Sequence, residues 1–337
     1  MSVLVDAWYR KRPWLILLTP LSLLFWILSS LRRLRFALFR KGVYQAGIPV
    51  IVIGNVTAGG TGKTPLVVTL AHYLKNHGYR PGIVTRGYKA KPPSLPYLIS
   101  AESTHQQTGD EALMISRHTH CPVVISPKRA EAIQYLEKKT DCDIILSDDG
   151  LQHYRMGRDI EIIVVDGSRG LGNRWLLPAG PLRESAGRLN QADYVICNGN
   201  NITALDYKMQ TMRLMPQSLF NLKNNQSISL DSDEARAIIN NKVHAVAGIG
   251  NPERFFTSLC NCGFDIITHI FPDHHDYQQQ ELQFQDDLPI VMTEKDAIKC
   301  VDWATEKFWY LSVTADLPDT FYQKFLAQIS ALKNSNQ

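Results

Sequence analysis

The chain has 337 residues, enough for two domains at a usual size of about 150 residues each. Its 45% hydrophobic and 20% charged residues are typical of an ordinary globular protein, and its net charge of +4 is too mild to indicate nucleic-acid binding. The six cysteines lack paired C-x-x-C spacing, so we expect reduced thiols in the cytosol rather than a disulfide framework or a zinc knuckle.

The N-terminal segment combines an apolar run with basic flanks. Residues 14–31 carry no charge, and as a helix they would extend about 27 Å, the short limit for crossing a bilayer. Arginine and lysine flank both ends, whereas a spanning helix usually has its basic excess on one side. We therefore expect residues 1–40 to form a membrane-associated helix that dips into one leaflet, with a kink at Pro20. A core helix or a cleaved signal peptide are the alternatives.

A glycine-rich turn between a strand and a helix is the central feature of the sequence. Residues 49–53 are apolar and β-branched, and helical spacing of apolar residues begins after Pro65. The turn between them matches the phosphate-binding pattern G-x-x-x-x-G-K-[ST], except for its first position. We expect the nucleotide phosphates to contact Thr57, Ala58, Gly59, Gly60, Thr61, Gly62, Lys63 and Thr64. Lys63 would reach the β- and γ-phosphates, and the Thr64 hydroxyl would hold Mg²⁺.

Strands and helices alternate after this turn, which predicts an α/β protein with a P-loop NTPase-like parallel sheet. We place a P-loop core at residues 41–205, a polar linker at 206–240 and a smaller α/β domain at 241–337. The predicted strands cover residues 82–85, 122–125, 143–146, 160–165, 192–196, 243–246, 289–292 and 309–313. The predicted helices cover residues 108–117, 128–139, 252–260 and 319–332.

Acidic residues lie at two places where a nucleotide site needs them. Asp148 and Asp149 follow a hydrophobic strand, as a Walker-B acid does. Neighbouring strand residues face opposite sides, so we expect one of the two to face the Mg²⁺. Thr108 and Glu111 have the spacing of a helix capping box, which by itself leaves Asp110 as an ordinary acid of the first helical turn.

Three other motifs allow more than one interpretation. Residues 273–276, Asp-His-His-Asp, are either a surface turn or a divalent metal site such as that of a metal phosphoesterase. Arg183 and Glu184 end a rigid turn and on spacing alone are a surface ion pair. Residues 293–296, Thr-Glu-Lys-Asp, are similar to the guanine-selecting N-K-x-D motif, but the lysine stands one place late, so GTP selectivity is not supported.

Several blocks taken together indicate a family. In chain order they are residues 59–65, 85–88, 109–113, 126–129, 148–153, 176–184, 271–275 and 293–297. In this order, and over nearly the whole chain, the sequence resembles the tetraacyldisaccharide 4'-kinase family of lipid A biosynthesis. The resemblance implies Mg²⁺-dependent transfer of the ATP γ-phosphoryl group to the 4'-hydroxyl of tetraacyldisaccharide 1-phosphate, giving lipid IVA. It also implies a location at the cytoplasmic face of the inner membrane.

The resemblance implies roles for the acceptor-side residues. Asp110 matches the general base for the sugar hydroxyl and His274 its partner, with His275 as the alternative. Because Asp110 and His274 fall in different predicted domains, we expect domain closure to assemble the site.

The same resemblance assigns residues around the phosphates. Asp148 and Asp149 match the metal side, and Arg183 and Glu184 match substrate- or metal-side positions. Weaker substrate positions are Arg86, Tyr88 and Arg129.

Two other classes of protein remain as alternatives to a kinase. A MinD/ParA-type ATPase switch would carry a second lysine just before the paired glycines, where this chain has Ala58. A metal phosphoesterase built on residues 273–275 would leave the phosphate-binding turn unexplained.

Overall fold

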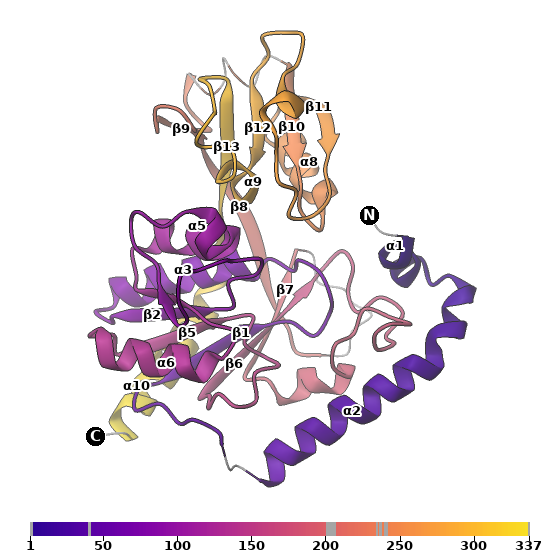
Figure 1. Ribbon diagram of the computed structural model, residues 1–337, viewed down its shortest axis with the longest axis vertical. Coiled ribbons are helices and arrows are strands. Elements are labelled where there is room, and N and C mark those ends of the chain that lie inside the picture. The colour runs from indigo at the N-terminus through magenta and orange to yellow at the C-terminus, as the bar shows by residue number, and fades with distance from the viewer. Residues whose placement is uncertain are drawn as a thin grey trace.

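The computed structural model describes residues 3–39, 42–199, 207–233, 235, 238 and 242–335. Its described strands form two units that share a continuous sheet, and the larger unit lies next to the N-terminal helices (Figure 1). The larger unit has the strand order β8 (Gln210–Asn221), β7 (Tyr194–Asn198), β6 (Ile160–Asp166), β1 (Val50–Gly54), β5 (Ile144–Asp148), β2 (Pro81–Thr85), β4 (Val123–Ile125) and β3 (Tyr97–Leu98). All neighbours in it are parallel except β3 and β4. The smaller unit continues with β13 (Phe308–Asp316), β12 (Ile290–Thr293), β10 (Lys242–Ala247) and β11 (Asp265–Ile270), while β9 (Ser227–Ser229) pairs with β8.

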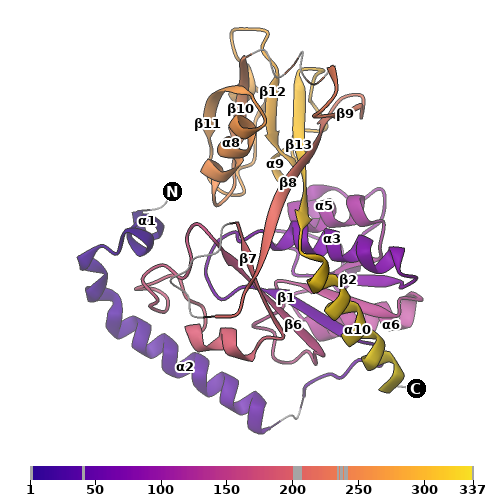
Figure 2. The same ribbon diagram turned by 180° about the vertical axis from the view of Figure 1, so that it is seen from behind.

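Both faces of the larger sheet are buried, which is why its strands read as continuous apolar runs. On one face Ile51 and Ile53 pack with α3 (Lys63–Asn76), α5 (Asp110–Thr119) and α10 (Asp319–Ser335). On the other face Val50 and Val52 pack with α6 (Arg129–Lys139). Figures 1 and 2 show α6 and α10 on opposite sides of the sheet. This arrangement confirms the predicted α/β class with a P-loop-type parallel core.

The division between the two units differs from the predicted one. Residues 206–240 include strand β8, which pairs with β7 at its start and with β13 along the rest of its length. Buried residues are few and widely spaced along β8, which lies between β7 and β13 and connects the two units, so its sequence lacks the apolar run of the other strands. The last helix, α10, packs on the larger unit through Phe321 and Phe325, although its sequence follows the smaller one. Both predicted linker boundaries fall at or next to residues outside the described ones.

The smaller unit also carries short helices at the junction. They are α8 (Pro252–Asn261), α9 (Glu294–Ala297) and the 3₁₀ turn η3 (Gln279–Leu282). Helix α9 packs against α5 of the larger unit. The junction therefore consists of strands β8 and β13 together with a helix–helix contact.

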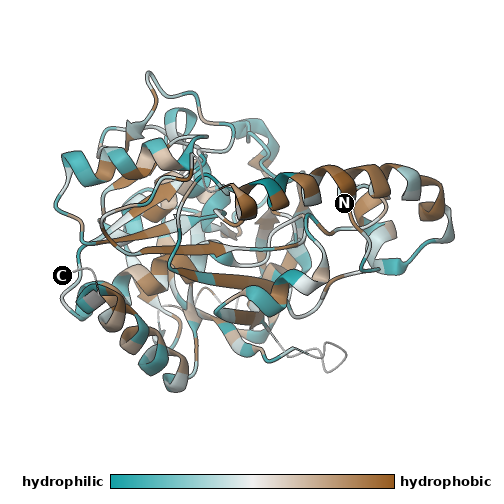
Figure 3. Cartoon of the chain, turned by 90° about the horizontal axis from the view of Figure 1, so that it is seen from below, coloured by the Kyte–Doolittle hydropathy of each residue, from teal (hydrophilic) through white to brown (hydrophobic). Residues whose placement is uncertain are grey.

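Three helical segments form the N-terminal part: α1 (Val3–Arg10), the 3₁₀ helix η1 (Pro13–Leu18) and α2 (Thr19–Leu38). Pro20 lies in the first turn of α2, where a missing backbone N–H costs nothing, so it starts the helix instead of kinking it. The segment Pro13–Phe36 is long and apolar enough to cross a membrane, and only 11% of its most apolar stretch is buried. That exposure contradicts the core-helix alternative. Figure 3 shows the hydrophobic residues along this helix at the side of the molecule.

Candidate active site

The glycine-rich turn has the strand–turn–helix form that the sequence predicts. It follows β1, and α3 begins at Lys63. Gly62 has φ +88°, and a side chain there would overlap the amide of Asn198, which donates to the Thr61 carbonyl at 2.9 Å. Only glycine fits such a position. The turn thus leads directly into the N-terminus of α3, the usual arrangement for binding phosphate.

The start of the turn is held by the segment that carries Arg183. Thr57 is buried and bridges to Leu182, and the Ala58 N–H donates to the Pro181 carbonyl at 2.7 Å. Arg183 lies next in this segment, and its N–H donates to the Val56 carbonyl at 2.7 Å. The pairing places the Arg183 side chain 3.3 Å from the Asp149 carboxylate.

Asp148 lies at the end of β5, in register with Ile53 of β1. It is buried, and its Oδ2 accepts a hydrogen bond from the Thr85 hydroxyl at 3.3 Å, whereas its Oδ1 has no partner in the described chain. Burial, together with the charge of Glu111, raises the pKa of Asp148 to about 7. A buried carboxylate oxygen without a partner beside a phosphate-binding turn fits one ligand of Mg²⁺, which takes few protein carboxylates when it binds with phosphates.

Asp149, the next residue, lies in a very different environment. Its Oδ1 is 3.4 Å from the Lys63 ammonium, and Arg183 contacts the same carboxylate. Burial would raise the pKa of Asp149, but the charges of Lys63 and Arg183 outweigh it and lower the pKa to about 2. This aspartate is therefore ionised and holds the two cations that the phosphates would meet.

The acceptor side begins at Asp110, the first residue of α5. The predicted capping box of Thr108 and Glu111 is wrong, because Thr104 and Gln107 form the capping box of a separate short helix, α4 (His105–Thr108). Gly109, with φ +79°, then turns the chain between the two helices. A Cβ at this position would lie 2.6 Å from the Tyr88 carbonyl oxygen, which is too close for any residue but glycine. This turn lets a new helix begin at Asp110. Its neighbour Glu111 is close enough to Asp148 to raise the pKa of that residue.

Asp110 and His274 are in contact across the junction of the two units. His274 Nδ1 is 3.3 Å from Asp110 Oδ2. His274 has φ +59°, an uncommon value for a residue with a side chain, and the Tyr88 ring lies 4.7 Å from its imidazole. Burial would raise the pKa of Asp110, but the hydrogen bond from His274 and the charge of Lys299 lower it below 3.8. The carboxylate is thus ionised and available to accept a proton.

The neighbouring His275 points elsewhere. Its Nε2 is 2.9 Å from Glu281, at the edge of η3. The two histidines thus contact different carboxylates, and in the described chain no group of three or more histidine, cysteine or acidic residues is arranged to hold a metal ion. This geometry gives no support to a phosphoesterase centre at residues 273–275.

Two predicted substrate or metal residues lie behind the site. Arg129 is 2% exposed and donates to the Asp148 and Ser126 carbonyls, so its guanidinium contacts the protein interior and not the surface that a substrate would approach. Glu184 is also buried: its two oxygens accept from Gln152 at 2.9 Å and Tyr154 at 2.6 Å. These interactions turn the Glu184 carboxylate away from a role as a metal ligand. The positions of Arg129 and Glu184 in the sequence motifs do not show whether their side chains point toward the substrate or into the protein interior.

The remaining predicted contacts are exposed. The Arg86 and Tyr88 side chains both reach the surface after strand β2. They remain available to a substrate that approaches Asp110 and Asp148.

The structure adds charged residues that the sequence analysis did not assign. Lys299 is 3.5 Å from Asp110 Oδ2, and Lys295 is 3.1 Å from His274 Nε2. Lys295 belongs to the family block at residues 293–297, which is also similar to a GTP-selecting motif, and Lys299 follows two residues after that block. Arg254 of α8 reaches the ends of β6 and β7, where it donates to Asp166 at 2.8 Å. The family block and the four-residue spacing of the lysines were the sequence signals for the first two.

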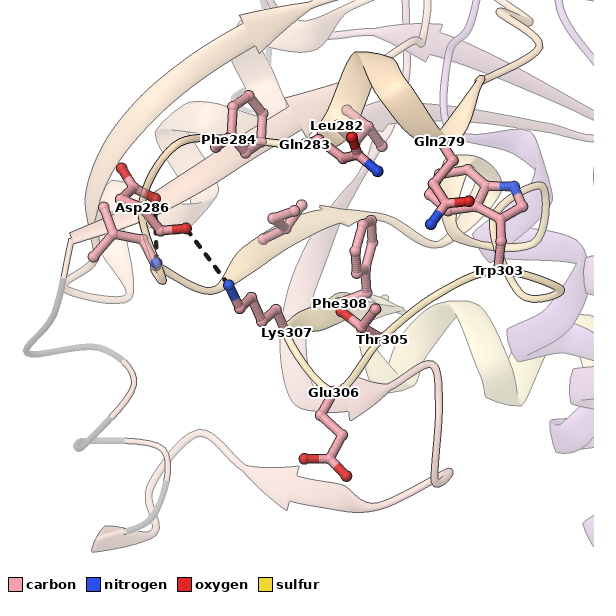
Figure 4. A pocket seen from close by; sticks show the side chains of 12 residues that line it. Gln279, Leu282, Gln283, Phe284, Asp286, Trp303, Thr305, Glu306, Lys307 and Phe308 are labelled. Carbon is pink, nitrogen blue, oxygen red and sulfur yellow. Dashed lines mark hydrogen bonds between the residues drawn. The ribbon is translucent and has the colours of Figure 1, made fainter.

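A separate cavity of about 470 Å³ lies in the smaller unit. Its walls include Trp303, Phe308 and Asp286, and none of the predicted site residues lines it (Figure 4). The site at the junction is therefore a surface between the two units and not this cavity.

Comparison with known proteins identifies the family. Residues 14–330 match the model of the Tetraacyldisaccharide-1-P 4'-kinase family. A tetraacyldisaccharide 4'-kinase of Idiomarina loihiensis is 44% identical over 99% of both chains, and one of Aeromonas salmonicida is 43% identical over 98% of this chain and 97% of its own. The crystal structure of LpxK from Aquifex aeolicus in complex with ATP superposes with a TM-score of 0.77 at 25% identity, covering 94% of this chain and 99% of that one. The chain belongs to the tetraacyldisaccharide-1-P 4'-kinase family and, as its sequence predicts, is a kinase of this lipid A precursor.

Proposed function

We propose that the chain carries out the family reaction with a donor side at the phosphate-binding turn and an acceptor side at Asp110. The γ-phosphoryl group of ATP, held by residues 57–64, passes to the 4'-hydroxyl of tetraacyldisaccharide 1-phosphate. The contact between Asp110 and His274, next to the Glu111 whose charge reaches Asp148, is the observation that supports these roles best.

On the donor side, the protein positions phosphates and neutralises their charge. The turn's N–H groups and the α3 N-terminus would bind the phosphates, and Lys63 would contact the β- and γ-oxygens. Mg²⁺, held by Thr64 and Asp148, would neutralise charge between the β- and γ-phosphates when bound. Asp149 keeps Lys63 and Arg183 in place before the nucleotide arrives.

On the acceptor side, Asp110 takes the proton. The sugar oxygen forms a bond to the γ-phosphorus. The bond between the γ-phosphorus and the oxygen that bridges it to the β-phosphate breaks, which releases ADP, and the hydroxyl proton passes to the Asp110 carboxylate. His274 and Lys299 both contact Oδ2, which leaves Oδ1 for the hydroxyl. A strongly basic residue is not required, because proton transfer comes late in a loose phosphoryl transition state.

The test is transfer of label from γ-labelled ATP to the lipid disaccharide. We expect label on the lipid and ADP in equal amounts, with both lost when Mg²⁺ is chelated. Label found only as free phosphate would contradict the proposal and favour an ATPase.

We further propose that α2 lies on the cytoplasmic face of the inner membrane. A stripe including Ser22 and Phe36 faces the protein: the Ser22 hydroxyl donates to the Leu176 carbonyl at 2.8 Å, and the Phe36 ring stacks on Tyr154. The opposite face exposes large apolar side chains: Leu17, Leu21, Leu24, Trp26, Leu28 and Leu31. A helix that packs one side on the protein and exposes a large apolar face is stabilised when lipid covers that face.

Basic side chains lie next to this apolar face, near the C-terminal end of α2. Arg32, Arg35 and Arg155 line a pocket of about 430 Å³ with Leu31 and Phe36, and no acidic residue lines it. Lipid phosphates complement such a surface.

Vesicle flotation tests this orientation. Leu24→Glu combined with Leu28→Glu should release the protein from vesicles of anionic phospholipid, whereas Met215→Glu, at an exposed apolar residue of β8, should not. Equal flotation of both variants would exclude α2 as the anchor.

A further inference from the structure

Residues 293–296, the motif that did not fit a GTPase, form a rigid support next to the Asp110–His274 pair. The Thr293 hydroxyl caps α9, and the fully buried Asp296 carboxylate accepts the Gly248 N–H at 2.9 Å and the Thr293 hydroxyl at 2.6 Å. The Gly248 carbonyl in turn accepts the His274 N–H at 3.2 Å. Helix α9 and the backbone of His274 are thus both hydrogen-bonded to the backbone of Gly248.

Lys295 projects from this support to the far side of the imidazole. Its Nζ is 3.1 Å from His274 Nε2, 3.1 Å from Asp273 Oδ1 and 3.2 Å from Glu111 Oε1. Burial would lower the pKa of Lys295, but Glu111 and Asp273 outweigh it and raise the pKa. The amine is therefore a charged ammonium, which can donate hydrogen bonds but cannot accept them.

The donor-only character of Lys295 decides the protonation of the ring. Nε2 of His274 must accept, so its proton is on Nδ1, the nitrogen that faces Asp110 Oδ2 at 3.3 Å. An imidazolium in this place would direct an N–H at the ammonium 3.1 Å away. Other charged groups around the pair are Lys299 on Asp110 and Lys89, whose Nζ contacts the His274 carbonyl, and neither lysine contacts Nε2. Asp273 Oδ1 lies 3.8 Å from Nε2, beyond hydrogen-bond distance, and contacts the Lys295 ammonium at 3.1 Å instead.

We propose that Lys295 is a positioning residue that holds His274 as the neutral Nδ1–H tautomer. His274 then serves as a hydrogen-bond donor that orients Asp110, and the proton taken from the sugar stays on Asp110 until product leaves. This inference rests on the proposed role of Asp110, but the tautomer can be measured without any turnover.

The experiment is ¹⁵N NMR of the full chain labelled at histidine, with His274→Gln used to assign the ring signals. At neutral pH the wild type should show a protonated Nδ1 and an unprotonated Nε2. Lys295→Met should change the ring to the Nε2–H tautomer or to imidazolium, and Lys295→Arg, another pure donor, should keep the wild-type signals. Lys89→Met, which loses a contact to His274 only at its backbone, is the matched control and should leave the signals unchanged.

Kinetics give a second readout. Lys295→Met should lower kcat by about tenfold, less than the loss of at least about 10² expected when the base itself is removed, with the KM for ATP unchanged. Lys295→Arg should restore most of kcat. If Lys295→Met does not fold, Lys295→Gln takes its place, since its amide can either donate or accept.

Two outcomes would overturn the inference: a wild-type ring that is Nε2–H or imidazolium, or an Nδ1–H ring that persists without Lys295. Failure of the kinase assignment is a separate result, because it is read as absence of label on the lipid while the ring signals remain measurable.

Discussion

At the end of β5, Asp148 and Asp149 are neighbours in the chain but lie in opposite environments. Asp148 is buried with an unpartnered oxygen and a raised pKa, whereas Asp149 lies between Lys63 and Arg183 and has a lowered pKa. Desolvation dominates the first and opposite charge the second. The Asp148 carboxylate is therefore suited to bind a metal ion, whereas the Asp149 carboxylate holds the Lys63 and Arg183 side chains.

Replacement of Asp110 by asparagine tests the base directly. Asp110→Asn keeps the shape of the side chain but removes the proton acceptor, so we expect kcat to fall by about 10²- to 10⁴-fold. The KM for ATP should change little, because the Asp110 carboxylate contacts His274 and Lys299 on the acceptor side. Steady-state kinetics with the lipid substrate measure both.

The same residue sets an acid limit on activity. Because the pKa of Asp110 is held below 3.8, it stays ionised through the neutral range, and the loss of kcat/KM that reports its protonation should lie below that pH.

Glu131→Gln, which removes the charge of an acid on α6 that pairs with Lys128, is the control for Asp110→Asn. Wild-type turnover in Asp110→Asn would refute the base role.

A comparison of two arginines tests whether Arg129 is structural. Arg129→Met removes donors to two buried carbonyls, which should destabilise the protein by about 1–3 kcal/mol while leaving the KM for lipid unchanged. Arg86→Met, at an exposed arginine, should show the reverse: unchanged stability and a raised KM for the lipid. Thermal unfolding and kinetics of both variants decide the matter. A raised lipid KM with normal stability in Arg129→Met would return Arg129 to the substrate side.

Among the elements, α5 and α9 join the two units through ionic contacts. His118 of α5 pairs with Glu294 of α9, and Lys295 reaches back to Glu111. The hydrogen bond to Glu294 raises the pKa of His118 despite its burial. A raised folded-state pKa means that this pair stabilises the fold below the ordinary value of 6.5, and that its contribution is lost as pH rises through the raised pKa.

His118→Gln should therefore destabilise the protein in acid more than in alkali. We expect about 1 kcal/mol at about pH 5.5 and close to nothing at about pH 9, measured as the shift of the unfolding midpoint relative to wild type. An equal shift at both values would mean that the contact contributes through packing and not through charge.

At the scale of the whole molecule, the two units are held together by chain that passes between them twice. Strand β8 leaves the larger sheet and enters the smaller one, and β13 returns beside it in the antiparallel direction. Helix α10 then packs its aromatic residues on the larger unit. This double connection holds the Asp110–His274 contact at the junction, and the C-terminal residues complete the core of the larger unit.

Truncation of one aromatic residue of α10 tests this organisation. Phe325→Ala removes a fully buried ring from the core shared with α3, so it should destabilise the larger unit by about 3–5 kcal/mol. Lys324→Ala, on the exposed side of the same helix, should change stability by less than about 0.5 kcal/mol. If Phe325→Ala left the unfolding midpoint of the larger unit unchanged, α10 would not contribute to the stability of that unit.

The sequence alone determined the features that depend on local pattern. The β1–turn–α3 unit, the alternating strands and helices, and the apolar N-terminal helix follow from residue spacing and backbone preference, which neighbours in the chain decide. The family motifs added the candidates Asp110 and His274. Only the tertiary structure decided which way side chains point: that Arg129 and Glu184 turn inward, that His274 and not His275 meets Asp110, and that Lys295 and Lys299 complete the pair. The contacts of Asp110 with His274 and Lys299, and of Glu111 with Lys295, join residues more than 150 positions apart, and no local pattern encodes such distances.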